Sequence, residues 1–215
     1  MVHTIPGTKK AGKTMGRRVI TIGRQYGSNG HRIAKKLSER LGIHYYDKEL
    51  IKIAGEMQNI TYEELLKVDE KRANPWRYPV EDEVQMAKQF RFEPMNDVLF
   101  YTQVEIIKDL AAKEDCIIVG RCANDILKGY EGCRSVFIHA PFEKRVEVIM
   151  ERASVDEREA SLLIKKIDKQ RRYYYNYFTD QKWEDMTQYD ICLNSGSVCE
   201  EQILDVLAAL YESIL

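Results

Sequence analysis

The residues with the clearest chemical potential form a glycine-rich segment between an apolar run and a helical pattern. A β-branched run at 18–23 leads into Tyr-Gly-Ser-Asn-Gly at 26–30, and helical periodicity begins directly after it. Glycines let a backbone approach an anion closely, and N–H groups at the start of a helix attract negative charge. The segment therefore predicts a phosphate-binding loop. The simpler alternative is a tight strand–helix turn that binds nothing.

This loop has no lysine at the position where a Walker motif carries one, because Gly30 stands there. Arg24 on the approach to the loop, and His31 and Arg32 at the start of the helix, are cations that could supply the missing charge. The side chains of the loop itself can add hydrogen-bond donors. The residues predicted to bind phosphate groups are Arg24, Gly27, Ser28, Asn29, Gly30, His31 and Arg32.

A second segment, residues 7–14, matches the pattern G-x-x-x-x-G-K-[ST] letter for letter. That pattern binds phosphate only when a strand precedes it and a helix follows it. Here only six residues precede the segment, and a strand-like run begins four residues after it. Because the segment is basic and rich in small residues, we expect residues 1–17 to be a flexible extension.

The composition is that of an ordinary globular protein, with 31% charged residues and a net charge of −1 over 215 residues. This balance gives no overall attraction to nucleic acid. No apolar run approaches the length of a membrane span, and the N-terminus lacks the apolar core of a signal peptide, so we expect a cytoplasmic protein without a membrane partner. The five cysteines and four histidines show no metal-ligand spacing, which predicts reduced thiols and no metal held by protein ligands alone.

The elements that must position the loop alternate along the chain. Strand-like runs occur at 18–23, 43–46, 115–120, 134–140 and 188–194, with helical patterns between them. This alternation predicts an α/β fold, a three-layer α/β/α domain over 18–215 with a five-stranded parallel sheet. Residues 47–113 contain several helical patterns and no convincing strand, so they predict a helical insertion lobe.

Two long helical patterns carry an apolar face. The face predicted within 94–113 consists of Val98, Tyr101, Val104, Ile107 and Leu110. The face predicted within 156–178 consists of Ile164, Ile167, Arg171, Tyr174 and Phe178. Arg171 is the charged member of an otherwise apolar stripe, which makes it a candidate functional residue. The alternative is an ordinary helical ion pair with Asp168.

Several pieces of sequence, taken in order, resemble one known family. They are ITIGRQYGSNGHRIAKKLSERLG, YYDKELI, IIVGRCANDIL, VFIHAPFEKRVEVI and the pair KKIDKQRRYYYNY and YDICLNS. Across roughly residues 18–215 the chain resembles the cytidylate kinase-like group of P-loop nucleotide kinases. The resemblance implies a P-loop NTPase core, an acceptor-binding lobe at 47–113 and a mobile lid helix within 154–183. It also implies ATP and Mg²⁺ as the phosphate donor pair and a CMP-like nucleoside monophosphate as the acceptor.

The resemblance also implies roles for particular residues. Arg121 follows a buried-looking strand, at the sheet edge where α/β proteins bind ligands, and matches the arginine that grips the acceptor phosphate. Asp47 matches a strand end near the acceptor, although capping of the following helix explains it equally well. Asp168 and Arg171 are similar to a lid pattern that neutralises the transferring phosphoryl group. The implied catalytic set is Arg32, Arg121, Asp168 and Arg171, and the implied substrate-binding set is Asp47, Arg121 and Arg145.

Two positions depart from the family pattern. Gly30 replaces the lysine that bridges the donor phosphates, and Val119 stands where comparable kinases often carry an acid. Phosphoryl transfer depends on positioning and charge stabilisation, so such losses can slow it greatly. A non-catalytic nucleotide-binding module and a kinase of another small phosphorylated metabolite therefore stay open as alternatives, as does a homo-oligomeric state.

Overall fold

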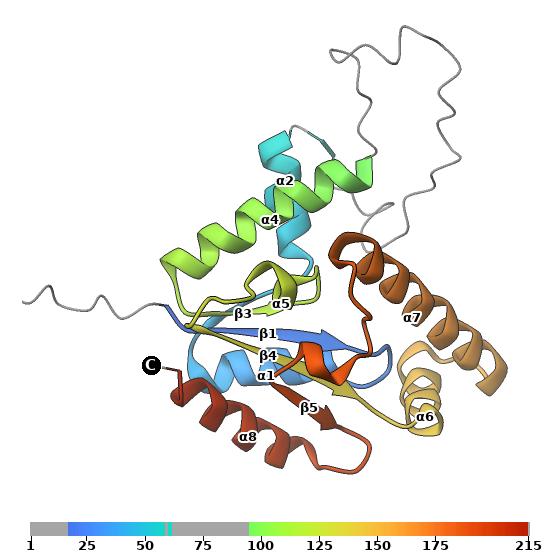
Figure 1. The fold of residues 1–215 in the computed structure, drawn as a ribbon. Coiled ribbons are helices and arrows are strands. Elements are labelled where there is room, and N and C mark those ends of the chain that lie inside the picture. Colours follow the sequence, from blue (N-terminus) through green and yellow to red (C-terminus); the bar gives the residue numbers. More distant parts are fainter. Residues whose placement is uncertain (1–16, 59, 62–94, 215) are drawn as a thin grey trace, which may run out of the picture.

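A parallel β-sheet forms the centre of the molecule (Figure 1). The computed structural model describes residues 17–58, 60–61 and 95–214. The five strands lie in the order β2-β3-β1-β4-β5. Their bounds are Val19–Arg24 for β1, His44–Tyr46 for β2, Cys116–Val119 for β3, Cys133–His139 for β4 and Ile191–Asn194 for β5. The predicted five-stranded parallel sheet is confirmed.

Helices cover both faces of this sheet, as the three-layer prediction requires (Figure 1). The helices of one face are α1 (Gly30–Leu41) and α8 (Glu200–Glu212), and those of the other are α2 (Glu49–Gln58), α4 (Met95–Lys113) and α5 (Ala123–Ile126). The strands point towards α6 (Phe142–Ala153) and α7 (Glu157–Thr179). These two helices therefore stand at the carboxyl edge of the sheet, where open α/β folds place ligands.

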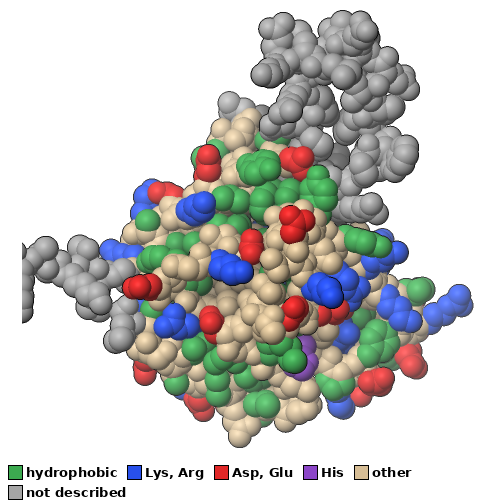
Figure 2. All heavy atoms as spheres, viewed as in Figure 1, with side chains coloured by type: hydrophobic (Ala, Val, Ile, Leu, Met, Phe, Trp, Pro, Cys, Tyr) green, Lys and Arg blue, Asp and Glu red, His purple; other side chains and the backbone are tan. Residues whose placement is uncertain are grey.

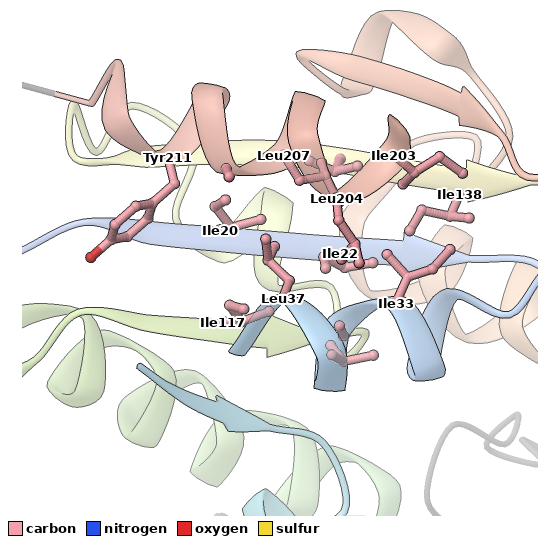
Figure 3. Packing of buried hydrophobic residues seen from close by; sticks show 14 of the residues in the cluster. Ile20, Ile22, Ile33, Leu37, Ile117, Ile138, Ile203, Leu204, Leu207 and Tyr211 are labelled. Atoms are coloured by element: carbon pink, nitrogen blue, oxygen red, sulfur yellow. The ribbon is translucent and has the colours of Figure 1, made fainter. Parts of the chain in front are cut away.

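The two faces of β1 are apolar because side chains alternate along a strand. Ile20 and Ile22 are fully buried and meet Ile33 and Leu37 of α1 on one face (Figure 3). Four α8 side chains complete this layer, namely Ile203, Leu204, Leu207 and Tyr211. Each fully buried aliphatic side chain contributes about 1.5–3 kcal/mol, so α1 is held firmly at the end of the glycine-rich loop.

The predicted apolar face of α4 is partly wrong. Tyr101 is 61% exposed, whereas Leu99 and Phe100, which lie outside the predicted stripe, are buried. The reason is that α4 contacts two clusters at once. Its Leu99 side packs against α2 and β3, and Phe100 stacks on Phe178 of α7 at 4.0 Å between ring centroids. A helix buried on two sides has a wider apolar arc than a single stripe of every third residue describes.

The last strand, β5, begins later than the run predicted at 188–194. β5 begins at Ile191 because the residues before it, Met186–Gln188, form a short 3₁₀ helix. The first helix, α1, ends at Gly42, which caps it with a positive φ of 64°. The predictions for residues 1–16, and for the lobe between 62 and 94, lie outside the described residues. Within the described part, no helix is long and apolar enough to span a membrane.

Candidate active site at the carboxyl edge of the sheet

The glycine-rich loop has the backbone geometry that its sequence requires. It joins β1 to α1, and both Gly27 (φ 83°) and Asn29 (φ 58°) adopt left-handed conformations. A Cβ on Gly27 would lie 2.9 Å from the backbone oxygen of Arg145, so any side chain at this position would collide with α6. The loop thus wraps the N-terminus of α1, where backbone N–H groups are available to an anion.

Ser28 stabilises the loop through its own backbone contacts. The side chain is buried, and its Oγ donates to the carbonyl oxygens of Gln25 (2.9 Å) and Ile138 (3.1 Å). The hydroxyl of Ser195 donates to the Ser28 carbonyl at 2.7 Å. These bonds join the loop to the ends of β4 and β5. Ser28 therefore contributes the shape of the loop, its N–H also donates to the Gln25 carbonyl at 3.3 Å, and its predicted role as a phosphate ligand stays a prediction.

A cavity of about 330 Å³ opens beside the loop. It is bounded by the loop, the end of β2, the segment after β3, and helices α6 and α7. The residues that line it are Arg24, Gln25, Tyr26, Gly27, Asn29, Gly30, His31, Asp47, Lys48, Arg121, Arg152 and Arg171. Among these described lining residues, five are arginine or lysine and Asp47 is the one acid. The cavity is therefore suited to a ligand that carries several negative charges.

The carboxylate of Asp47 lies close to three basic side chains of this cavity. Its Oδ1 accepts a hydrogen bond from Arg121 Nη1 at 2.5 Å and lies 3.6 Å from Arg24 Nη2. Its Oδ2 lies 3.4 Å from His31 Nε2. Asp47 and Arg121 are both buried, so each charge depends on the other for compensation. The structure thus brings together four residues predicted separately from the sequence, with the carboxylate of Asp47 facing the other three.

The segment that presents Arg121 has an unusual backbone. Gly120 (φ 77°), Arg121 (φ 54°) and Cys122 (φ 57°) are three consecutive left-handed residues. A non-glycine residue in this conformation costs about 1–3 kcal/mol and persists only where its surroundings hold it. Here the turn directs a buried guanidinium from the end of β3 towards Asp47 and the carbonyl of Val119. Such strain is typical of functional sites.

Helices α6 and α7 supply the other cations. Arg171 Nη1 donates to the carbonyl of Arg24 at 3.0 Å, which places this residue of α7 against the end of β1, where the loop begins. Arg152 of α6 lies over the ring of Tyr26, 5.1 Å from its centroid. Figure 2 shows Lys and Arg side chains gathered over the part of the surface formed by α6 and α7. Arg152 and Lys48 were not predicted from the sequence.

Comparison with known proteins shows the family of this chain and agrees with its fold. Residues 19–197 match the model of the cytidylate kinase-like family. The chain belongs to this family. A cytidylate kinase of Methanopyrus kandleri is 26% identical over 208 residues, covering 92% of this chain and 94% of the relative.

Solved structures agree with the P-loop kinase fold. An uncharacterized protein from Eubacterium ventriosum is 30% identical, with a TM-score of 0.69, covering 92% of this chain and 99% of that one. A shikimate kinase from Bacteroides thetaiotaomicron has a TM-score of 0.52 at 13% identity, covering 91% of this chain and 98% of that one. At that identity the likeness concerns the fold alone.

Arg145 and Asp168 lie beside the loop and are not among the residues that line the cavity. They form a buried ion pair at 2.5 Å between α6 and α7. Asp168 Oδ1 also accepts a hydrogen bond from the N–H of Tyr26 at 2.8 Å, and Arg145 Nη1 donates to the Tyr26 carbonyl at 3.2 Å. The pair therefore holds the loop against both helices. This placement favours a positioning role over the predicted direct contact with substrate.

Arg32 points away from the other predicted catalytic residues. Its Nε donates to Glu200 of α8 at 2.6 Å, its side chain is 59% exposed, and it is not among the lining residues. We expect Arg32→Ala to change the affinity for MgATP by less than about twofold and the unfolding free energy by less than about 1 kcal/mol, because exposed ion pairs contribute little. Isothermal titration and urea unfolding measure the two effects. A tenfold loss of affinity for MgATP would show that Arg32 does contribute to nucleotide binding.

Proposed function

We propose that this protein transfers the γ-phosphate of ATP to a nucleoside monophosphate, with CMP as the first acceptor to test. The observation that carries this proposal is the convergence of five arginine and lysine side chains on one cavity beside an anion-binding loop. A polyphosphate donor and a phosphorylated acceptor together bring enough negative charge to balance them. Membership of the cytidylate kinase-like family supports the same reaction.

In this proposal, three parts of the site have separate roles. The loop and the N-terminus of α1 bind the donor phosphates, Arg121 holds the acceptor phosphate, and Arg171 meets the group in transit. An oxygen of the acceptor phosphate attacks the γ-phosphorus, the bond to the β,γ-bridging oxygen breaks, and ADP leaves. The attacking oxygen is already ionised near neutral pH, so the step needs no protein base. Positioning and charge stabilisation are what the protein must supply.

Magnesium fits this site as a companion of the nucleotide. Mg²⁺ keeps several waters and is bound mainly by substrate phosphates with one or two carboxylates. Among the described lining residues the carboxylate is that of Asp47, which is already engaged by Arg121. The described part of the chain therefore offers no cage of its own, and Asp47 is the cavity residue that would reach a phosphate-bound ion. When bound, the ion would neutralise charge on the donor phosphates.

The departures from the family pattern define the alternatives. Gly30 and Val119 leave out two groups that comparable kinases use, which favours a module that binds nucleotide without transferring phosphate. A different phosphorylated metabolite as acceptor would use the same cations. A kinase of either kind would work in the cytoplasm, where ATP and phosphorylated metabolites are present. These alternatives differ in measurable products, so one set of experiments separates them.

Joint binding of donor and acceptor is the expected result. With MgATP and CMP each at about 100 times its dissociation constant, each ligand adds about 2.7 kcal/mol of stability by mass action. For a chain of this size that raises Tm by about 5–10 °C per ligand. Cytidine, which lacks the phosphate, is the matched control and should give little shift. Differential scanning calorimetry measures these shifts.

A coupled assay of ADP release across nucleoside monophosphates and other phosphorylated acceptors completes the test. Faster ADP release with CMP or another monophosphate than without an acceptor supports the proposal. Phosphate transfer only to a different phosphorylated metabolite would identify the protein as a kinase of that metabolite. ATP binding with no transfer to any acceptor would favour the non-catalytic module.

A further inference from the structure

The position of the absent lysine, now Gly30, is sterically closed by Arg24, the last residue of β1. A Cβ built on Gly30 would lie 2.6 Å from Cβ of Arg24 and 3.2 Å from its Cγ. The nearer atom is the root of the Arg24 side chain, which cannot swing away as a flexible tip could. Any side chain at position 30, lysine included, is therefore incompatible with Arg24 in its present place.

The same contact shows that side chains at positions 24 and 30 would start from nearly the same point. The Arg24 side chain starts within 2.6 Å of where a side chain of residue 30 would start. Four bonds separate Cβ from Nζ in lysine and Cβ from Cζ in arginine, so the charged groups have a similar reach. A guanidinium also offers several donors in a planar fork that matches phosphate oxygens in pairs.

The surroundings of Arg24 favour an anion at its end. The side chain is 9% exposed, lines the cavity beside the loop, and has Nη2 3.6 Å from Asp47 Oδ1. The two other cations predicted for this task are placed differently. His31 is 54% exposed and faces the other oxygen of Asp47, and Arg32 pairs with Glu200 outside the cavity.

We propose that Arg24 takes the place of the Walker lysine and binds the β- and γ-phosphates of ATP. The cation then stands at the end of β1 instead of at the end of the loop, and Gly30 is glycine because the Cβ and Cγ of residue 24 occupy the space that a side chain at position 30 would need. This inference rests on the proposed function, since it names the residue that holds the donor in that reaction. It makes Arg24 and Gly30 a coupled pair, which neither residue alone would reveal.

Charge substitutions at position 24 test the role of the guanidinium. Arg24→Gln keeps most of the side-chain length and removes the charge, and we expect it to weaken MgATP binding by at least about tenfold, as loss of a charge-assisted hydrogen bond does. Arg24→Lys keeps the charge and should retain most of the affinity. Arg40→Ala, an exposed arginine on the same α1, is the matched control and should bind as wild type. Isothermal titration with MgATP measures all four proteins.

A swap tests the coupling. Gly30→Lys alone should lower Tm by several degrees and weaken MgATP binding, because the new side chain collides with Arg24. Arg24→Gly removes the obstructing Cβ, so Arg24→Gly/Gly30→Lys should recover Tm and bind MgATP more tightly than Arg24→Gly does. Equal affinities of Arg24→Gln and wild type would overturn the inference, whether or not the swapped protein folds.

The failure of this inference and of the proposed function are distinguishable. Wild type that binds MgATP and transfers phosphate, with Arg24→Gln unchanged, would overturn the role of Arg24 alone. Wild type that binds no MgATP would overturn both.

Discussion

Arg121→Ala is expected to reduce the rate of phosphoryl transfer by about 100- to 1,000-fold, which corresponds to about 2.7–4 kcal/mol of lost transition-state stabilisation. The reason is that Arg121 brings a buried guanidinium from the end of β3 to the lining of the cavity, where Asp47 is its partner. An ionised acceptor phosphate bound there would depend on this guanidinium for much of its charge compensation. Steady-state kinetics with ATP and CMP measure the loss, in both kcat and the KM for the acceptor.

The control for Arg121→Ala must separate catalysis from folding. Arg121→Lys keeps one positive charge near Asp47, so it should hold the fold while losing the paired donors of a guanidinium. Arg40→Ala removes an exposed arginine from α1 and should leave the kinetics unchanged. If Arg121→Ala proved folded, by circular dichroism and Tm, and turned over at the wild-type rate, Arg121 would have no part in the transfer.

Asp168→Ala is expected to lower the unfolding free energy by about 3–5 kcal/mol, because it leaves Arg145 as an uncompensated buried charge. For a chain of this size the corresponding fall in Tm is about 6–20 °C. The N–H of Tyr26 loses its acceptor in the same variant, so the loop should also bind MgATP less tightly. Urea unfolding and calorimetry measure the first effect, and isothermal titration measures the second.

Replacing both partners distinguishes a lost charge pair from lost packing. Asp168→Leu/Arg145→Met removes both charges and keeps apolar volume, so it should recover much of the stability that Asp168→Ala loses. Affinity for MgATP should stay reduced, since no carboxylate would hold the Tyr26 N–H. If Asp168→Ala lowered the unfolding free energy by less than about 1 kcal/mol, the pair would contribute no more than an exposed ion pair does. That result would show that it is not a buried clamp.

The sequence was informative about the fold because its signals were local and strong. The run 18–23, the glycine-rich loop and the amphipathic helix after it predicted the β1–loop–α1 unit. Alternation of strands and helices predicted the parallel sheet. The face of α4 was harder to predict because Phe100 is buried by α7, a helix far away in the chain. A prediction of one apolar face on a helix contains no information about a second element that packs against another face.

The site was only partly accessible from the sequence. Asp47 and Arg121 were identified separately, but their contact joins residues 74 positions apart, which no local pattern encodes. Arg152 was missed because a charged residue near the end of an amphipathic helix is indistinguishable from a solvated one. Asp168 was identified by its spacing to Arg171, yet its partners are Arg145 and the backbone of Tyr26. Tertiary contacts decide such roles.

The left-handed turn at Gly120, Arg121 and Cys122 carries an evolutionary consequence. Glycine would relax the backbone at position 121, but it would also leave the buried carboxylate of Asp47 without its closest partner. Over time, selection for stability at this position therefore weighs relief of backbone strain against the loss of a buried ion pair. The sign of the stability change in Arg121→Gly would show which of the two is larger.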